Sequence, residues 1–142
     1  MAKKIKHPIT GRKTTVNALK KRAWKSFSRY IRERDKICVI CGGSPDHAGH
    51  YFHNGDKQSN SLKGNELWYD EKNIHACCVS CNLRKHGNLH LYAIRLIDMY
   101  GSRVLHKLEK KFNTPKEWTV ESLIKIEDKY NKKYICQRNI AH

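Results

Sequence analysis

The sequence has few acidic residues, no long apolar segment and no apolar stretch at its N-terminus. Its 142 residues include 13 Asp and Glu against 29 Lys and Arg, which gives a formal net charge of +16. No run approaches the roughly 20 apolar residues that a membrane helix needs. The N-terminal MAKKIKHPITGRK also lacks the apolar core of a secretory signal. These absences argue against a membrane or secreted protein, and we expect a cytoplasmic one.

The surplus of positive charge indicates the class of partner. A strongly basic protein attracts phosphate backbones and releases their counterions when it binds. Solubility alone does not require a net charge of +16, because small soluble domains usually carry a net charge of magnitude about 2 to 8. We therefore predict a nucleic-acid partner. The charge is concentrated near the N-terminus, where residues 1–36 hold 13 Lys and Arg but only two acids.

The chain is long enough for one domain with a modest core plus extensions. It contains no internal repeat and no coiled-coil heptad. Its pattern predicts an α+β fold, with a small metal-bound core flanked by basic helices. The predicted segments are a flexible basic arm over 1–15, a basic helix over 16–36, the core over 37–88 and a C-terminal helical extension over 89–142.

Residues 16–36 have the apolar spacing of an amphipathic helix. The opposite face is rich in lysine and arginine, and two compatible interpretations of it remain open. It is a solvated helix surface, or it also lies along the phosphates of a nucleic acid. The residues of this helix that we assign to DNA binding are Lys20, Lys21, Arg22, Lys25, Arg29 and Arg32.

The C-terminal extension is predicted to be helical in two parts. Apolar residues recur at helical spacing from 89 to 112, with a break expected near Gly101, and Pro115 marks a stop. Thr119 is suited to cap a last helix, with Trp118 and Leu123 placed as a hydrophobic staple.

Two Cys-x-x-Cys pairs predict a structural zinc site. Each two-residue spacer lets both sulfurs face one ion, and four thiolates fit tetrahedral zinc. Paired cysteines in an intracellular chain favour metal binding over disulfides. Cys77 is an alternative to Cys78, but Cys78 has the two-residue spacing to Cys81; Cys136 is left as a buried or idle thiol. The predicted zinc ligands are Cys38, Cys41, Cys78 and Cys81.

Polar residues gather beside these cysteines in a pattern that a zinc site alone does not need. His50, Asn73 and Asn82 occupy the places expected of an HNH nuclease, whose ββα-metal unit is a hairpin followed by a helix around one divalent ion. In that family an Asn precedes the third Cys by five residues, a metal-binding His or Asn follows the fourth Cys, and a Lys comes shortly after. Asn73, Asn82 and Lys85 meet these three requirements.

A narrower resemblance covers roughly residues 31–101. The strings AGHY (48–51), YDEKNIH (69–75), CVSCN (78–82) and KHGN (85–88) are similar to the phage NinG (Rap) recombination nucleases. The resemblance implies a structure-selective endonuclease that cuts branched recombination intermediates such as Holliday junctions and D-loops, inside an infected bacterial host. Two symmetric cuts in a four-way junction would suit a homodimer, by analogy.

The resemblance also implies roles for individual residues. His50 is the candidate general base, because a neutral imidazole accepts a proton from water near neutral pH. Asn73 would orient that imidazole through an amide hydrogen bond. The Asn82 side-chain oxygen would help hold a catalytic Mg²⁺ or Mn²⁺. Lys85 or Arg84 would stabilise charge at the scissile phosphate.

One departure from the HNH pattern concerns the catalytic metal. Many HNH enzymes have an acidic ligand directly before the base histidine, where this chain has Gly49. His47 or Asp46 would supply the missing ligand, with His53 or Asp70 as weaker candidates, and we choose His47. An imidazole ligand favours Mn²⁺ or another transition ion over Mg²⁺.

Other interpretations of the same residues stay open. Asn73 can hold a turn, Asn82 can cap a helix, and His50 can be a packing histidine. His75 fits a structural hydrogen bond at least as well as a catalytic role. At the level of function, the alternatives are a non-catalytic zinc-knuckle protein that binds nucleic acid, and an HNH nuclease that cuts ordinary duplex DNA.

Overall fold

The computed structural model describes residues 2–53 and 59–140, in which helices mix with short strands. The α+β class is therefore as predicted. The elements are β1 (Ile5–Lys6), β2 (Lys13–Thr14), α1 (Val16–Asp35), β3 (His47–His50), β4 (Lys63–Asn65), β5 (Ile74–Cys77), the π-helical turn η1 (Ser80–Arg84), α2 (Leu89–Tyr100), α3 (Val104–Phe112), β6 (Pro115–Glu117) and α4 (Val120–Ile140). Among the described helices, none is long and apolar enough to cross a membrane.

Helix α1 begins and ends close to its predicted bounds, and local contacts explain both ends. The Thr15 hydroxyl oxygen accepts a hydrogen bond from the Ala18 N–H at 3.1 Å, which satisfies one donor of the first turn. At the other end Lys36 has a left-handed φ of 63°, and its N–H donates to the Arg32 carbonyl. Before the helix, the segment predicted as a flexible arm contains the two-stranded β1–β2 ribbon.

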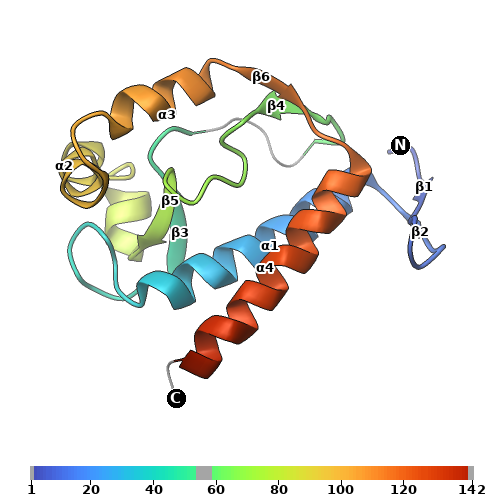
Figure 1. Cartoon of the computed structure of the whole chain (residues 1–142), viewed down its shortest axis with the longest axis horizontal. Coiled ribbons are helices and arrows are strands. Elements are labelled where there is room, and N and C mark those ends of the chain that lie inside the picture. Colours follow the sequence, from blue (N-terminus) through green and yellow to red (C-terminus); the bar gives the residue numbers. More distant parts are fainter. Residues whose placement is uncertain (1, 54–58, 141–142) are drawn as a thin grey trace.

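Helices α1 and α4 lie side by side along one edge of the molecule (Figure 1). Arg22 pairs with Glu127 and Arg29 donates to Asn131, so the two helices run in the same direction. Thr119 caps α4 as predicted, since its hydroxyl accepts a hydrogen bond from the Ser122 N–H at 3.0 Å.

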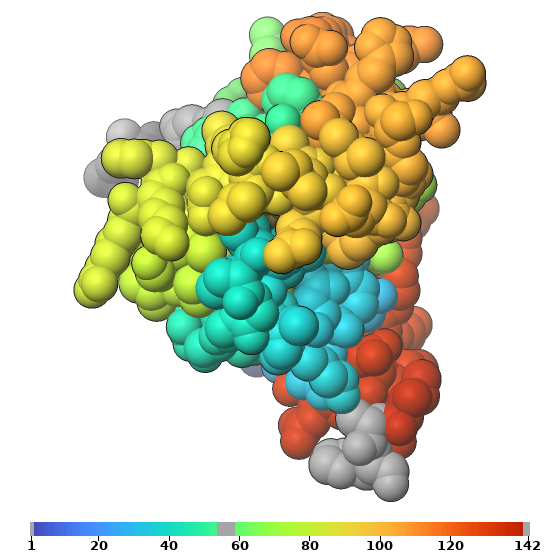
Figure 2. Space-filling model, turned by 90° about the vertical axis from the view of Figure 1, so that its left-hand side faces the viewer, coloured from blue at the N-terminus to red at the C-terminus, as the bar shows by residue number. Residues whose placement is uncertain are grey.

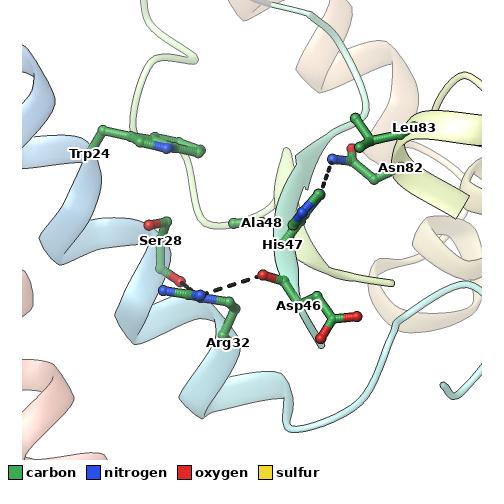
Figure 3. Close-up of a pocket in the computed structure, with 8 residues that line it drawn as sticks. All are labelled: Trp24, Ser28, Arg32, Asp46, His47, Ala48, Asn82 and Leu83. Atoms are coloured by element: carbon green, nitrogen blue, oxygen red, sulfur yellow. Dashed lines mark hydrogen bonds between the residues drawn. The ribbon is translucent and has the colours of Figure 1, made fainter. Parts of the chain in front are cut away.

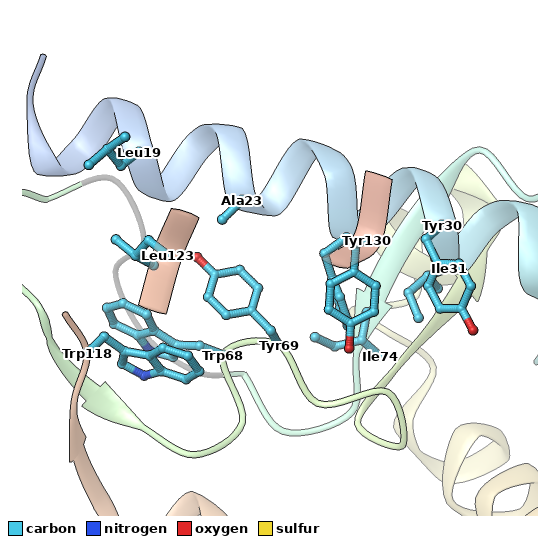
Figure 4. Close-up of a cluster of buried hydrophobic side chains, with 11 residues drawn as sticks. Leu19, Ala23, Tyr30, Ile31, Trp68, Tyr69, Ile74, Trp118, Leu123 and Tyr130 are labelled. Atoms are coloured by element: carbon cyan, nitrogen blue, oxygen red, sulfur yellow. The ribbon is translucent and has the colours of Figure 1, made fainter. Parts of the chain in front are cut away.

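The side chains between α1, α4 and the turn before β5 form the aromatic core, shown in Figure 4. Phe27 meets the rings of Tyr69 and Tyr130 edge-on, with centroid separations of 5.8 and 4.6 Å. Trp68 stacks on Trp118 at 5.9 Å, and both are buried. The aromatic core consists of Leu19, Ala23, Phe27, Tyr30, Ile31, Trp68, Tyr69, Ile74, Trp118, Leu123 and Tyr130.

A second core lies under α2 and α3. These helices are separated at Gly101, whose φ of 94° interrupts the helical path where the break is predicted. Figure 2 shows the surface of this side, with α2 and α3 in yellow to orange above the turquoise loop that carries the first cysteine pair. The second core consists of Cys38, Ile40, Leu67, Cys77, Cys81, Tyr92, Leu96, Val104 and Leu108.

Strands β3 and β5 form an antiparallel pair that leads directly into η1. His47 lies opposite Cys77, and His50 opposite Ile74. The end of α1 fixes this pair: the Asp35 carboxylate accepts the Ala76 N–H at 2.8 Å and is itself held by Arg34. The strand pair is thus attached to both cores.

Candidate functional site

The four predicted zinc ligands converge. Their sulfur atoms all lie within 4.8 Å of one another, and the Cys41 and Cys78 sulfurs are 3.6 Å apart. A tetrahedral site with Zn–S bonds of about 2.3 Å requires sulfur separations of about 3.8 Å. The cluster could therefore hold a metal ion such as zinc without a large rearrangement.

Backbone contacts hold the cluster in place. The Val39 N–H donates to the Ala76 carbonyl at 2.8 Å, which ties the first cysteine loop to β5. Burial disfavours the Cys38 thiolate, but hydrogen bonds from the backbone of Cys41 and Cys78 lower the pKa of Cys38 to about 7. A cysteine with that pKa is readily deprotonated, as metal binding demands.

Cys77 and Cys136 lie outside the cluster. Burial raises the pKa of Cys77 to about 12, so this residue remains a thiol, and its sulfur faces the His75 carbonyl at 3.5 Å. The structure thus favours Cys78 over Cys77 as the partner of Cys81, as the spacing predicted. Cys136 is an exposed thiol on α4 rather than a buried one.

Beside the cluster, a cavity of about 420 Å³ opens between α1, β3 and η1 (Figure 3). Across it, the Asn82 amide nitrogen lies 2.8 Å from His47 Nδ1. Arg32 reaches in from α1 and donates to the Asp46 carbonyl at 3.4 Å. The cavity is lined by Trp24, Ser28, Arg32, Asp46, His47, Ala48, Asn82 and Leu83.

The alternation of side chains along β3 divides its histidines between two neighbours. His47 points to Asn82 on η1. His50 instead stacks on Trp24 of α1, with ring centroids 5.0 Å apart and planes 15° apart. Trp24 could not be identified from the sequence, because its position in α1 gives no sign of a partner on β3.

A side chain at Gly49 would have to displace its neighbours. A Cβ at Gly49 would lie 2.8 Å from the Cys77 sulfur and 2.9 Å from Asn82 Oδ1. The Gly49 carbonyl also accepts a hydrogen bond from the buried Tyr92 hydroxyl at 2.8 Å. A carboxylate at this position would therefore crowd the Asn82 oxygen, whereas His47, two residues earlier on the same side of β3, reaches Asn82.

Asn73 does not orient the imidazole of His50, so that prediction needs correction. The Asn73 side-chain oxygen accepts the Phe52 N–H at 2.8 Å, and its amide nitrogen donates to the Phe52 carbonyl at 3.0 Å. Asn73 is fully buried and its amide is engaged by one backbone segment. It fixes the chain that leaves β3 just after His50, which supports the alternative that Asn73 holds a turn.

His75 is a structural residue. Its ring nitrogens lie 3.1 Å from the Tyr92 hydroxyl and 2.8 Å from the Tyr100 hydroxyl. Burial, together with the nearby Arg34 charge, lowers the pKa of His75 to about 4, so the imidazole is neutral near pH 7. Tyr92 links this network to the Gly49 carbonyl, and hence to the cavity.

The other candidate ligands are less well placed than His47. Asp46 lines the cavity, but its carboxylate accepts a hydrogen bond from Ser44 at 2.8 Å. Asp70 pairs with Lys111 at 2.7 Å. His53 is exposed, with its ring centroid 6.0 Å from that of His50.

Lys20 is not available for DNA binding, contrary to the prediction. It is 1% exposed, and its ammonium donates to the carbonyls of Ser59 and Ser61 at 3.1 and 3.0 Å. The ammonium also lies 4.5 Å from the Trp68 ring centroid. Helical spacing places Lys20 on the apolar face, three positions before Ala23 and seven before Phe27, and Ser59 and Ser61 cover its ammonium.

The remaining basic residues occupy different surfaces. Arg22 and Arg29 contact α4, Lys21 and Lys25 are exposed, and Arg32 alone among them lines the cavity. Two further basic residues, Arg84 and Lys85, are exposed at the end of η1 but do not line the cavity.

Comparison with known proteins places the chain in a family. The family described as "Bacteriophage Lambda NinG protein" matches residues 2–139. Proteins named "Protein ninG" are similar: that of Escherichia phage 933W is 36% identical over 124 residues, which cover 84% of this chain and 58% of the relative. The corresponding protein of Escherichia phage lambda is 33% identical, with coverages of 84% and 57%.

The Salmonella phage P22 protein of that name is 33% identical over 118 residues, with coverages of 80% and 54%. The chain therefore belongs to the NinG family of bacteriophage proteins, and it spans only somewhat more than half the length of these relatives. No solved structure matches the chain.

Proposed function

We propose that this protein is a metal-dependent DNA endonuclease of the HNH type. The proposal depends above all on one observation: His47, Asn82 and the strand that carries His50 meet at a single cavity beside the four-cysteine cluster. The order of the elements, an antiparallel strand pair followed by a short helical turn, suits a ββα-metal unit. A non-catalytic zinc protein has no need of this arrangement.

Phosphodiester hydrolysis needs an activated water, stabilisation of the charged transition state and departure of the 3′ oxygen. In the proposed reaction His50 removes a proton from water as the water oxygen bonds to phosphorus. The bond from phosphorus to the 3′ oxygen then breaks, and the leaving oxygen takes a proton from solvent. Arg32 supplies positive charge inside the cavity, while Arg84 and Lys85 supply it from the exposed end of η1.

The donor atoms at the cavity fit a divalent cation. Asn82 offers an amide oxygen, and His47 offers the imidazole nitrogen that now contacts the Asn82 amide nitrogen. A 180° turn of the Asn82 amide would bring its oxygen beside that nitrogen. A bound Mg²⁺ or Mn²⁺ supplies Lewis acidity at the phosphate. The nitrogen ligand favours Mn²⁺ or another transition ion over Mg²⁺.

The substrate we propose is branched DNA, such as Holliday junctions and D-loops, in the cytoplasm of an infected bacterial cell. The net charge of +16 supports a polyanionic partner. Basic residues on separate surfaces, Arg32 in the cavity and Lys21 and Lys25 outside it, suit contact with more than one DNA segment. The names of the relatives state no substrate, so the selectivity for branched DNA is itself proposed.

A homodimer is part of the same proposal, with the outer face of α2 as its interface. Leu91, Ile94 and Ile97 on that face are 41%, 43% and 38% exposed. Helix α2 carries one arginine and one aspartate, so it has no net charge in a strongly basic chain. A second copy is repelled least there, whereas DNA gains nothing from an apolar surface.

Light scattering should give twice the mass of one chain, and Ile94→Glu should halve it; a wild-type monomer at micromolar concentration would exclude the dimer.

The decisive experiment compares cleavage of a labelled four-way junction with cleavage of the matched linear duplex, in Mg²⁺ and in Mn²⁺. We expect faster cutting of the junction, more activity in Mn²⁺, and a loss of about 10²–10⁴-fold in His50→Ala with junction binding retained. His106→Ala, an exposed histidine on α3, is the matched control. Binding without cutting in either metal would reject the nuclease and favour a zinc-knuckle binding protein. Equal cutting of both DNAs would favour an ordinary duplex nuclease.

A further inference from the structure

The stack of Trp24 on His50 joins two elements that are far apart in the sequence. Trp24 lies on α1, and His50 is the last residue of β3. Their rings are nearly parallel, with an interplanar angle of 15° and centroids 5.0 Å apart. Figure 3 shows the Trp24 indole at the edge of the cavity, across from His47 and Asn82.

Trp24 is itself held in place. It packs against the aromatic core, and its ring lies 5.9 Å from that of Phe27. It is half-buried, whereas the deeper core residues are covered, so one part of the indole anchors the residue and another borders the cavity. Because α1 is fixed at both ends and packed along α4, the indole is a rigid surface for the imidazole.

We propose that Trp24 is a positioning residue for His50. The inference rests on the proposed function, and it assigns the orientation of the general base to Trp24 rather than to Asn73. Asn73 cannot take this role, since both atoms of its amide bond the backbone of Phe52. A flat indole holds an imidazole close to one plane, and this confines the directions in which its nitrogens can point to that plane.

The indole also favours the product of the proton transfer. When His50 takes a proton from water, the neutral ring becomes an imidazolium. The face of an indole attracts a cation more strongly than any other aromatic side chain does. The attraction is larger after the proton transfer than before it, so it lowers the barrier of the chemical step rather than the dissociation constant of the substrate.

The test compares Trp24→Leu, which removes the aromatic face, with Trp24→Phe, which keeps one. Tyr134→Leu is the control, because Tyr134 is another half-buried aromatic residue that packs on the aromatic core but does not contact His50. We expect kcat to fall about 10- to 100-fold in Trp24→Leu, with KM within about twofold. Trp24→Phe should recover most of the loss, and Tyr134→Leu should change only the melting temperature.

A second readout does not depend on cleavage. In NMR spectra, with His50→Ala used to assign the signals, the ring protons of His50 should be shifted upfield by the indole. They should return toward ordinary values in Trp24→Leu and stay shifted in part in Trp24→Phe. The same spectra show whether each variant is folded.

The outcomes separate this inference from the proposed function. A wild-type protein that cuts no DNA rejects the function, and the positioning role with it. Cleavage by the wild type with an unchanged kcat in Trp24→Leu rejects the positioning role alone, as does the absence of an upfield shift. Equal losses in Trp24→Leu and Tyr134→Leu would show that Trp24 acts only through stability.

Discussion

The two sides of the molecule are stabilised in different ways. On the helix-pair side, α1 and α4 enclose the aromatic core, which is stabilised by ring contacts and by the burial of apolar side chains. On the metal side, which comprises the cysteine cluster, β3, β5, η1, α2 and α3, the strands are short and cysteines contribute to the core. The four cysteines could hold a metal ion, and a metal bound there would add stability to this side.

The candidate site lies where these two sides meet. His47, His50 and Asn82 belong to the metal side, whereas Trp24 and Arg32 belong to α1. Asp35 joins the sides through the Ala76 N–H. The geometry of the site therefore depends on both sources of stability, and each can be weakened separately.

The largest effect should follow the loss of a cysteine ligand. We expect Cys78→Ser to cost several kcal/mol, because structural zinc contributes about 10–16 kcal/mol of binding free energy in small zinc peptides. Amide hydrogen exchange should show faster exchange in β5 and η1 than in α1 and α4. Cys136→Ser, at an exposed thiol, should change neither zinc content nor exchange. Equal loss of protection on both sides would mean that they unfold as one unit.

The next effect concerns the closed space beside Gly49. We expect Gly49→Ala to cost about 1–3 kcal/mol in urea unfolding, since the added Cβ would lie 2.8 Å from the Cys77 sulfur. Combination with Cys77→Ala should recover part of this cost, because the double variant removes the nearest atom. If the two substitutions were simply additive, the contact with Cys77 would not be the cause.

A comparable but pH-dependent effect is expected at His75. Its pKa is about 4 in the folded state and about 6.5 when unfolded, so only the unfolded chain binds the proton between these values. Stability should therefore fall as the pH drops from about 6.5 to 4, by up to roughly 3 kcal/mol. His75→Gln should flatten this part of the unfolding curve relative to wild type. Parallel curves for the two proteins would show that His75 does not carry the pH dependence.

The smallest effect on folding is expected at Lys21, which differs sharply from its neighbour Lys20. Lys20→Met should cost about 1–3 kcal/mol in stability, since it leaves the Ser59 and Ser61 carbonyls without their donor, and should leave the salt dependence of DNA binding unchanged. Lys21→Met should do the reverse: little change in stability, but a decrease of about one in the slope of log affinity against log salt. Fluorescence anisotropy at several salt concentrations measures the slope. A lower slope for Lys20→Met would contradict its burial.

Much of the fold could be predicted from the sequence because the signals are local. The start of the first helix near residue 16, the Thr119 cap and the break at Gly101 depend on residues a few positions apart, so spacing alone placed them. The cysteine cluster was predictable for a similar reason, since a two-residue spacer already brings two sulfurs to one point. Asn82 was predicted from a resemblance and His47 from the departure at Gly49, and the structure brings these two residues into contact.

Only the tertiary structure decided which side chains from distant parts of the sequence contact one another. Asn73 bonds the Phe52 backbone, Lys20 is covered by the segment after β3, and Trp24 stacks on His50. Each of these contacts spans about 20 or more positions, and helix or strand periodicity specifies only which face a residue occupies, not what packs against that face. The sequence by itself determined the helix ends, the cysteine cluster and the family; the packing of α1 against β3 decided which residues meet at the cavity.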